Sequence, residues 1–411
     1  MGKPNIVTAI DIGSANIKLL TAIKKEKEKE IDILFKTQIS SMGVRRGIVI
    51  DANKVSEIIT LLISKAEENC GEVINEVIVN VGGSHLFSKI SRGLVSVSRA
   101  DQKISEEDIQ RVIQQSQAIA LGSNQEIILV SPKEFIVDGQ QGIKEPLGLK
   151  GTRLEVETVV VGGFDPYIKN LEEAISDANL SFSELIPTPL ASAYGVLEER
   201  EKELGVAVLD IGAGTTNLSV FEEGNLIHLS VFPMGSANIT NDIAICLKID
   251  IDLAEQIKLK FGHYLAQKNE RKSQKKEKIM IEKKDSKEII SFNKKALVQI
   301  IEARVVEILK EVQKELKKIG KAHHLPAGVV LTGGGAKLPH LIELSKKYLK
   351  LPSRIGIPKG FSSELEDPSF ATLVGLTINA LTKTKEERRD LLTFHKKFVK
   401  GIKKIFRFFI P

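Results

Sequence analysis

The chain has 411 residues, of which 42% are hydrophobic and 27% charged, and its formal net charge is +6. This composition is typical of a globular protein, the chain is long enough for two or more cores, and disorder is not the default expectation. Its two cysteines offer neither a CxxC pair nor zinc-ligand spacing, and no apolar run reaches the roughly 18 residues that a membrane-spanning helix needs. We therefore expect a cytoplasmic protein without a structural metal or a transmembrane segment.

The N-terminal residues predict the antiparallel start of a sheet. Apolar stretches that indicate strands lie at residues 6–13, 16–25 and 31–40, with Gly13 in the first turn. A helical stretch at residues 53–68 precedes a buried strand at 76–83. This mixture of strands and helices favours the α/β class.

The pattern changes in the next part of the chain. Short strands at residues 93–99, 126–132, 134–140 and 154–163 surround one helix at residues 106–120. Ser105 precedes that helix and is a good N-cap residue. We interpret this region as a small inserted α+β subdomain.

A second large half opens at residue 205 with another strand, turn and strand. The almost entirely charged stretch at residues 267–287 predicts a solvated loop or a frayed helix. A helix with apolar spacing from Leu297 to Leu309 follows, and residues 328–349 predict a strand, a glycine turn and a helix. A charged connection at residues 383–390 separates this body from the C-terminal tail.

The two halves begin with similar hairpins, "DIGSANIKL" from Asp11 and "DIGAGTTNL" from Asp210. Small residues let backbone N–H groups approach a polyphosphate, while hydroxyl groups and a lysine add donors. Each hairpin also carries one carboxylate, and Mg²⁺ is often bound by carboxylates through its water shell. We predict that the hairpins face one another across a cleft and hold a magnesium nucleotide. The candidate residues are Asp11, Gly13, Ser14, Ala15, Asn16 and Lys18 in the first hairpin, and Asp210, Gly212, Ala213, Gly214, Thr215, Thr216 and Asn217 in the second.

These hairpins and the later "TGGGAKLP" turn resemble, in order and spacing, the two phosphate loops and the adenosine loop of the actin, Hsp70 and sugar-kinase superfamily. Within it, the chain is similar to the FtsA family of bacterial cell-division proteins over nearly its whole length. The segments that carry this similarity are "GVRRGIVID", "VNVGG", "GIKEPLGLKGTRLE", "DIA" and "AEQIK".

The resemblance implies an actin-like (ribonuclease H-like) two-domain fold that binds ATP and Mg²⁺. It also implies that Glu255 and Lys258 touch the ribose, and that the adenosine lies beside Gly333, Gly334, Gly335 and Ala336. The domain boundaries that we expect are 1–83 with 164–204 for the first domain, 84–163 for an SHS2-type insert, 205–382 for the second domain, 383–393 for a linker and 394–411 for a membrane-targeting helix.

One departure from the superfamily bears on hydrolysis. Hsp70-like hydrolases carry a glutamate that orients the attacking water at the place where this chain has Thr188. A general base typically contributes about 10²- to 10⁴-fold to a rate. We therefore assign no catalytic side chain, expect at most slow ATP turnover, and interpret ATP as a ligand that fixes the interdomain angle and favours assembly.

The C-terminal tail predicts an amphipathic helix. Its apolar and basic side chains separate completely at 100° per residue, which suits a helix lying in the interface of an anionic membrane. The residues expected to contact the membrane are Phe398, Ile402, Ile405, Phe406 and Phe409 on the apolar face, and Lys396, Lys400, Lys403 and Arg407 on the basic face. The alternative is that this helix docks on the body of the protein or on a partner, as calmodulin targets do.

The partners follow from the resemblance. They are the acidic C-terminal peptide of the tubulin-like protein FtsZ, further copies of the chain in an actin-like filament, an anionic membrane surface at the division site and later division proteins; nucleic acid is not expected. Arg304 is the candidate for binding the FtsZ peptide, and its alternative role is a surface ion pair with Glu307 or Glu311.

Two other functions share parts of this pattern. A PilM-like assembly ATPase of type IV pili or secretion has the same fold and insert but generally lacks a cationic amphipathic C-terminus. A small-molecule kinase would need a catalytic carboxylate in a substrate pocket and has no use for such a tail.

The tail makes a first prediction. Removing the chain from Phe394 onward should abolish co-sedimentation with anionic vesicles, because both the apolar face and the cations are lost. The full-length chain with neutral vesicles is the control for the electrostatic part. Undiminished binding of the truncated chain to anionic vesicles would exclude the tail as the membrane anchor.

Overall fold

The computed structural model describes residues 5–24, 31–262, 278–282, 289–361 and 363–382. The chain divides into two compact units: unit 1 comprises Met1–Gly82, Pro166–Gly195 and Pro358–Pro411, and unit 2 comprises Gly83–Asp165 and Val196–Ile357. No helix among the described residues is long and apolar enough to cross a membrane. The predicted linker at 383–393 and helix at 394–411 lie outside these residues.

Unit 1 is built on a five-stranded sheet in the order β11-β6-β1-β2-β3. Strands β1 to β3 are antiparallel, and β6 and β11 add to the sheet in parallel. The strands are β1 Asn5–Ile12, β2 Asn16–Lys24, β3 Ile31–Ser40, β6 Glu76–Val81 and β11 Ser181–Pro187, and a small hairpin joins β4 Val44–Arg45 to β5 Ile48–Val49. The three predicted N-terminal strands are thereby confirmed.

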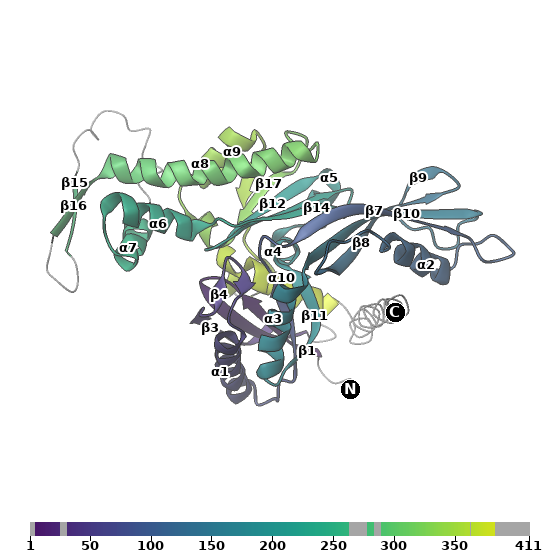
Figure 1. The fold of residues 1–411 in the computed structure, drawn as a ribbon, viewed down its shortest axis with the longest axis horizontal. Helices are drawn as coiled ribbons and strands as arrows, with labels where there is room; N and C mark the ends of the chain where they lie inside the picture. Colours follow the sequence, from purple (N-terminus) through teal and green to yellow (C-terminus); the bar gives the residue numbers. More distant parts are fainter. Residues whose placement is uncertain (1–4, 25–30, 263–277, 283–288, 362, 383–411) are drawn as a thin grey trace. The chain divides into compact units, whose positions relative to one another are not determined.

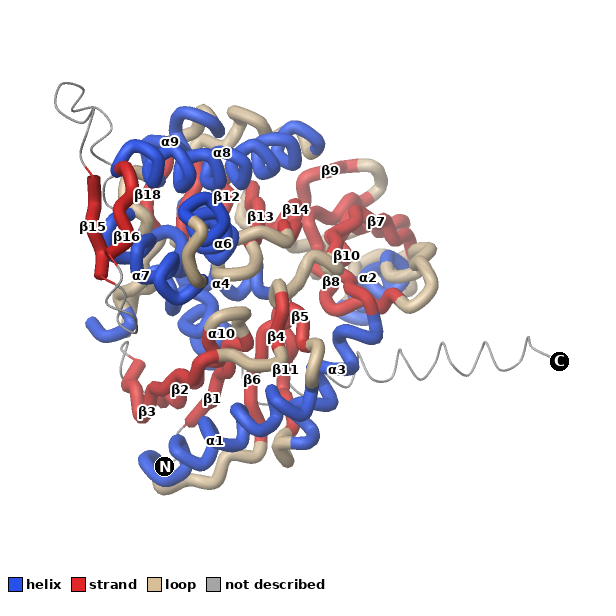
Figure 2. Tube along the Cα trace, turned by 60° about the vertical axis from the view of Figure 1, so that its left-hand side comes forward, coloured by secondary structure: helices blue, strands red, loops and turns tan. Residues whose placement is uncertain are grey.

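Helices cover both faces of this sheet. Helix α1 packs on β2 and β3, whereas α10 packs on β1, β2 and β6 from the opposite side (Figures 1 and 2). The central strands are consequently buried at nearly every residue, which is typical of a sheet covered on both faces. The helical elements are α1 Ala52–Cys70, α3 Asp165–Asp177, α4 Thr188–Val196, η4 Ser363–Leu365, η5 Pro368–Phe370 and α10 Ala371–Thr382.

Unit 2 contains a second five-stranded sheet, in the order β14-β13-β12-β17-β18. Its β12-β13-β14 meander and the parallel partner of β12 repeat the connectivity of the first sheet. The strands are β12 Val206–Ile211, β13 Thr216–Glu222, β14 Asn225–Phe232, β17 Gly328–Thr332 and β18 Ser353–Ile355. The helical elements are α5 Glu199–Leu204, α6 Ser236–Leu247, α7 Ile251–Phe261, α8 Lys294–Lys318, η3 Gly334–Lys337 and α9 Leu341–Leu349. The predicted helix containing Leu297 and Leu309 is α8, and both leucines are fully buried.

The inserted subdomain belongs to the same compact unit and has its own four-stranded sheet, in the order β7-β10-β8-β9. Its elements are β7 Phe87–Ser96, α2 Glu106–Ser116, β8 Gln125–Val137, β9 Gln140–Ile143 and β10 Arg153–Phe164. Ser105 caps α2 as predicted, but the helix ends at Ser116 instead of residue 120. The two strands predicted at 126–132 and 134–140 form one strand, β8. Pro132 and Glu134 pair with consecutive residues of β10, so Lys133 forms a bulge that accommodates the proline.

The charged stretch at 267–287 contains a strand that we did not predict. β15 (Lys278–Glu282) pairs antiparallel with β16 (Ile289–Asn293). Ile279 is buried opposite Phe292, while Met280 is exposed, so a period of two runs through this segment. The interpretation as a loop or frayed helix is wrong for these five residues, because the surrounding lysines and glutamates hide the short alternation.

Helices α4 and α10 touch through their backbones. A Cβ atom on Gly375 would lie 1.8 Å from the carbonyl oxygen of Ala191, and one on Gly195 would lie 2.2 Å from that of Ala371. Contacts this short cannot exist, so only glycine fits at these two positions. The first unit therefore depends on a seam without intervening side chains.

Replacing Gly375 by alanine should lower the free energy of unfolding by about 1–3 kcal/mol, although alanine is the better helix former. Urea unfolding followed by circular dichroism measures this. Gly122→Ala is the control, because the new Cβ would meet only the flexible end of Gln125. A Gly375→Ala variant as stable as the control would contradict the close contact.

Candidate functional site

The first hairpin joins β1 to β2 in unit 1. Asp11 lies opposite Lys18 in the antiparallel register, and the Lys18 Nζ atom is 3.3 Å from Asp11 Oδ2. The N–H of Gly13 donates to the carbonyl of Asn16 at 3.1 Å and closes the turn. Asp11 is only 6% exposed. The hairpin thus holds a nearly buried carboxylate and an ammonium group side by side at its turn.

The second hairpin, between β12 and β13 in unit 2, has the same construction. Asp210 lies opposite Asn217, whose Nδ2 donates to Asp210 Oδ2 at 3.0 Å. The N–H of Gly212 donates to the carbonyl of Thr215 at 2.8 Å. Asp210 is 5% exposed. Both hairpins therefore pair an aspartate with the residue seven positions later and close their turns with the same backbone bond.

One atom of the second hairpin has unused hydrogen-bonding capacity. Within the described part of the chain, Asn217 Oδ1 is buried and has no hydrogen-bond partner. A buried acceptor without a donor costs free energy, so such an atom is usually satisfied by water or a ligand. Beside the Asp210 carboxylate, it gives a second oxygen that suits the water shell of Mg²⁺. The donor set of this hairpin therefore fits a hydrated magnesium ion.

The glycine turn after β17 lies directly against the second hairpin. Gly333 has φ = 83°, and a Cβ atom there would lie 2.2 Å from Asp210 Oδ1. A Cβ atom on Gly335 would lie 2.5 Å from Cγ2 of Ile211. Of the predicted residues, the structure thus brings Gly333 to Ala336 together with the hairpin of Asp210, and the two glycines allow this approach.

The start of helix α6 also contacts the second turn. The N–H of Ser236 donates to Gly212 O and that of Ala237 to Ala213 O, both at 2.9 Å. Gly235 permits this contact, because a Cβ there would lie 2.5 Å from Gly212 O. Sequence analysis missed Ser236, although the glycine just before an apolar helix was a usable signal.

Glu255 and Lys258 on α7 reach the first turns of α6. Lys258 Nζ lies 2.9 Å from Thr240 Oγ1, 2.7 Å from Glu255 Oε2 and 3.3 Å from the carbonyl of Ser236. The Thr240 hydroxyl also donates to Glu255. Both charged side chains therefore contact the N-terminal part of α6, which is also the part that contacts the second turn.

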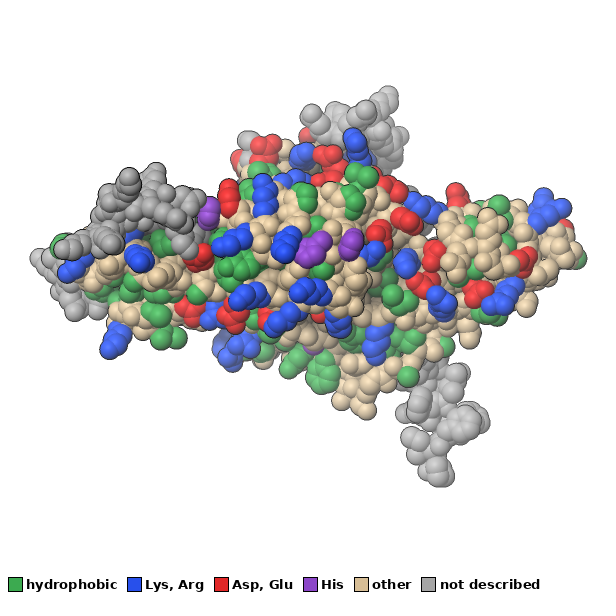
Figure 3. Space-filling view, turned by 90° about the horizontal axis from the view of Figure 1, so that it is seen from above, with side chains coloured by type: hydrophobic (Ala, Val, Ile, Leu, Met, Phe, Trp, Pro, Cys, Tyr) green, Lys and Arg blue, Asp and Glu red, His purple; other side chains and the backbone are tan. Residues whose placement is uncertain are grey.

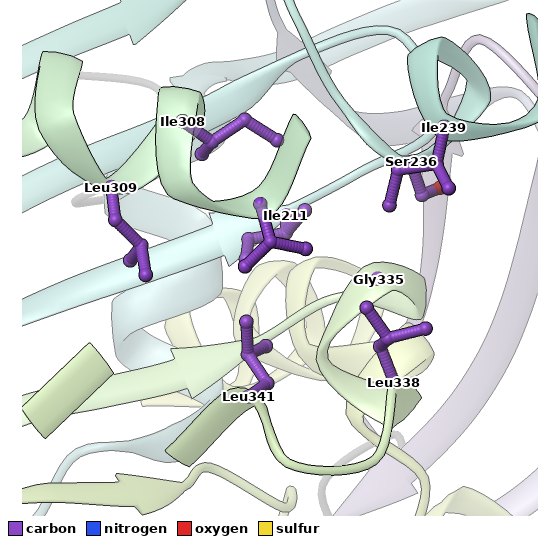
Figure 4. A pocket seen from close by; sticks show the side chains of 9 residues that line it. Ile211, Ser236, Ile239, Ile308, Leu309, Gly335, Leu338 and Leu341 are labelled. Atoms are coloured by element: carbon purple, nitrogen blue, oxygen red, sulfur yellow. The ribbon is translucent and has the colours of Figure 1, made fainter. Parts of the chain in front are cut away.

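A narrow pocket lies beneath the glycine turn (Figure 4). Its walls are apolar except for Ser236, and come from β12, α6, α8, the glycine turn and the start of α9; the lining residues are Ile211, Ser236, Ile239, Val305, Ile308, Leu309, Gly335, Leu338 and Leu341. Such a lining offers no charged group to a phosphate. The polar groups that could hold a nucleotide belong instead to the second hairpin.

Comparison with known proteins decides the family. The family model described as "Cell division protein FtsA" matches residues 207–375, and the one described as "SHS2 domain inserted in FTSA" matches residues 83–162. The Cell division protein FtsA of Pseudomonas aeruginosa is 32% identical over 381 residues, covering 92% of this chain and 90% of that protein. The chain belongs to the FtsA family.

Other FtsA proteins show the same relationship. That of Bacillus subtilis is 32% identical and covers 92% of this chain and 83% of its own, and that of Borreliella burgdorferi is 33% identical and covers 91% and 90%. The chain is thus an actin-like cell-division protein with an SHS2 insert, and the expected resemblance is confirmed.

Solved structures support the actin-like fold of this FtsA family member. The "PilM-PilN type IV pilus biogenesis complex" contains a chain with a TM-score of 0.66 at 18% identity, covering 91% of this chain and 98% of that one. MreB5 of Spiroplasma citri bound to ADP has a TM-score of 0.55 at 12% identity, covering 92% and 97%. At these identities the likeness concerns the fold alone.

Thr188, where the FtsA family member departs from Hsp70-like hydrolases, has a structural role. Its hydroxyl donates to the carbonyl of Val81 at 3.0 Å and accepts from Asn80 Nδ2 at 3.0 Å. Asn80 Oδ1 in turn accepts the N–H of Ile12 at 2.7 Å. This buried chain of hydrogen bonds ties the start of α4 to the end of β1, next to the first turn. Asn80 was missed, although a polar residue inside an apolar strand was a signal.

The turn itself has a second anchor in unit 1. Ser14 Oγ accepts the N–H of Gly47 at 2.8 Å, and the N–H of Ser41 donates to the carbonyl of Ala15 at 2.9 Å. Because the Ser14 hydroxyl acts as acceptor in the first bond, its proton remains able to donate to a phosphate. Gly47, within the "GVRRGIVID" segment, and Ser41, just before it, thus hold the first turn.

Arg304 on α8 is held by two carboxylates. Its Nε and Nη2 atoms lie 2.7 and 2.8 Å from the two oxygens of Asp242, and Nη1 lies 2.7 Å from Glu307. The hydrogen bonds to Asp242 raise the pKa of the Arg304 guanidinium further. Basic and acidic side chains are interspersed over the face seen in Figure 3. An acidic peptide would therefore meet a guanidinium that already donates three of its five N–H groups to these two carboxylates.

The membrane residues predicted in the tail, including Phe398 and Lys400, lie outside the described residues.

Replacing Thr188 by valine should lower the free energy of unfolding by roughly 1–3 kcal/mol, because Asn80 Nδ2 and the Val81 carbonyl would both lose a partner in a buried site. Thr188→Ser keeps the hydroxyl and should stay near wild type in urea unfolding. Equal stability of the two variants would show that the hydrogen bonds contribute nothing.

Proposed function

We propose that this FtsA family member binds ATP with Mg²⁺ through its two aspartate hairpins and acts as an actin-like adaptor in cell division. The observation that carries the proposal is the matched hairpin construction, in which each unit has an aspartate one residue before the end of a buried strand and close to a tight glycine turn. Actin-like neighbours support a nucleotide as ligand, since MreB5 of Spiroplasma citri binds ADP in one solved structure and AMPPNP in another.

In this proposal, Asp11 and Asp210 hold the ion through water, and the turn amides, hydroxyls and Lys18 bind the phosphates. The bound ion would neutralise phosphate charge. Asn217 Oδ1 would accept a hydrogen bond from the ion's water shell, and Ser14 would donate to a phosphate oxygen. Glu255 and Lys258 contact the ribose, and Gly333 to Ala336 contact the adenosine.

The adaptor hydrolyses ATP slowly or not at all. Thr188 occupies the place of the water-orienting glutamate, and its hydroxyl makes two structural hydrogen bonds. Binding and release of ATP, which favour and disfavour the assembled form, would then regulate the protein. We expect turnover well below the usual enzyme range of about 1 to 10³ per second.

The adaptor links the FtsZ C-terminal peptide to the cytoplasmic face of the membrane at the division site, polymerises with copies of itself and recruits later division proteins. The amphipathic pattern of residues 394–411 supports the membrane part, and family membership supports the division role. Arg304 is the proposed contact for the acidic peptide, through the N–H donors that do not bind Asp242 or Glu307.

A PilM-like role in pilus assembly is less well supported. The PilM–PilN structure shares the fold at 18% identity, whereas FtsA proteins reach 32% over most of the chain. The basic amphipathic tail also favours the division adaptor.

Removing the Asp210 carboxylate tests the nucleotide site. Asp210→Ala should weaken ATP binding roughly 10- to 100-fold in the presence of Mg²⁺, and chelating Mg²⁺ should weaken binding to the wild type similarly. Isothermal titration calorimetry measures both. Asp252→Asn, an exposed carboxylate on α7, is the matched control and should leave the affinity unchanged. Unchanged affinity in Asp210→Ala would refute the site.

Electron microscopy on lipid monolayers tests the assembly. With ATP and Mg²⁺, the wild type should form filaments confined to an anionic monolayer, and neither Asp210→Ala nor the chain truncated before Phe394 should do so. Filaments of the same density without nucleotide would contradict the role of ATP in assembly.

A further inference from the structure

Lys18 has contacts beyond its own hairpin. Its ammonium donates to the backbone carbonyl of Ser369, some 350 residues away in sequence, and lies 5.4 Å from the centre of the Phe370 ring. The ammonium also lies 3.3 Å from the Asp11 carboxylate. The side chain is only 12% exposed. A carboxylate, a carbonyl and an aromatic face therefore fix the position of this ammonium group.

The segment that supplies the carbonyl and the ring is itself held rigidly. Asp367 Oδ1 accepts the N–H of Ser369 at 2.8 Å and its hydroxyl at 2.7 Å, and the N–H of Phe370 donates to the carbonyl of Asp367 at 3.0 Å. Pro368 fixes the backbone between them. Helix α10 begins at the next residue, Ala371, and packs on β1, β2 and β6. Ser369 and Phe370 are thus anchored to the sheet that carries Lys18.

A second lysine approaches the same ring without touching the turn. Lys36 on β3 lies 5.1 Å from the centre of Phe370, and its Nζ is 3.1 Å from the Glu364 carbonyl. Two ammonium groups near one ring repel each other, and the negative face of the ring offsets part of this repulsion. Lys36, which also pairs with the Glu364 carboxylate at 3.3 Å, therefore offers a comparison: it has the same aromatic partner, and within the described residues it makes no contact with Asp11.

An ammonium group has three N–H donors. In the described residues, Asp11 and Ser369 take two donors of Lys18, which leaves one for another acceptor. A charged donor makes its strongest hydrogen bond to an anion, and this group lies beside the turn that the proposed function assigns to the phosphates. An ammonium that is fixed in advance loses less side-chain entropy when it binds.

We infer that Ser369 and Phe370 are positioning residues, which hold the Lys18 ammonium ready for a nucleotide phosphate. This inference rests on the proposed function. Because coupling between two sites is reciprocal, nucleotide binding also stabilises the segment from Asp367 to the start of α10. The element that leads into the C-terminal part of the chain therefore belongs to the first phosphate site.

The test compares two variants at the same ring in the full-length chain. Phe370→Leu keeps an apolar side chain but removes the aromatic face, and should weaken binding of ATP with Mg²⁺ about 3- to 10-fold in calorimetry. Lys36→Met removes the other cation and should leave the affinity within about 2-fold of wild type. If Phe370→Leu binds as wild type does, or if Lys36→Met loses as much affinity, the positioning role is overturned.

Hydrogen exchange on the wild type gives a readout that needs no variant. The backbone amides of Ser369 and Phe370 should exchange more slowly when ATP and Mg²⁺ are added, whereas the turn amide of Gln102 in the insert should not change. Equal exchange at Ser369 and Phe370 with and without ATP, under conditions where calorimetry shows ATP bound, would overturn the inference alone. Absence of any ATP binding to the wild type would overturn the proposed function and the inference with it.

Discussion

The structure depends on keeping a carboxylate nearly buried at the end of a central strand. Removing a charge from water is expensive unless partners compensate for it. In unit 1 the compensation for Asp11 includes the Lys18 ammonium, and in unit 2 the compensation for Asp210 includes the Asn217 amide. Each carboxylate thus has a different kind of partner, an ammonium group in the first hairpin and an amide in the second.

The close packing around the second turn explains why glycine stands at positions 333 and 235. Strand β17 runs parallel to β12, and the turn that follows β17 comes very close to the Asp210 carboxylate. Only a glycine fits at position 333 in this turn. The start of α6 approaches the turn carbonyls in the same way, because Gly235 has no side chain to prevent it. The Asp210 carboxylate and the turn beside it thereby require glycine at two positions, 333 and 235, that are far apart in sequence.

Much of this site could be predicted from the sequence, because its main signals are local. Alternating apolar residues around a D-x-G turn predict each hairpin, and the repetition of the turn distinguishes it from an ordinary one. The insert and the glycine turn were also predictable from composition changes and spacing. The boundaries of the domains and the cleft between the two hairpins remain predictions.

Two kinds of feature could not be predicted from the sequence: contacts between residues far apart in the chain, and strands whose pattern is obscured by neighbouring charged residues or by a proline. The contacts of Lys18 with Ser369 and of Asn80 with Thr188 join residues that no local period connects. The strand from Lys278 was hidden by neighbouring charges, and β8 was divided wrongly because Pro132 usually interrupts strands. Arg304 was correctly weighed as a possible ion pair, but its partner Asp242 on another helix was not foreseen.

The backbone seam between α4 and α10 has a mechanical consequence. Where two helices touch through Gly195 and Gly375, no side chain can rearrange to absorb a displacement. A pull on the chain beyond residue 382 would therefore pass from α10 to α4 with little slack. From Thr188 at the start of α4, the buried hydrogen bonds through Asn80 continue to Ile12. A force applied to the chain after α10 would thus be transmitted to Ile12, next to the first turn, without local unfolding.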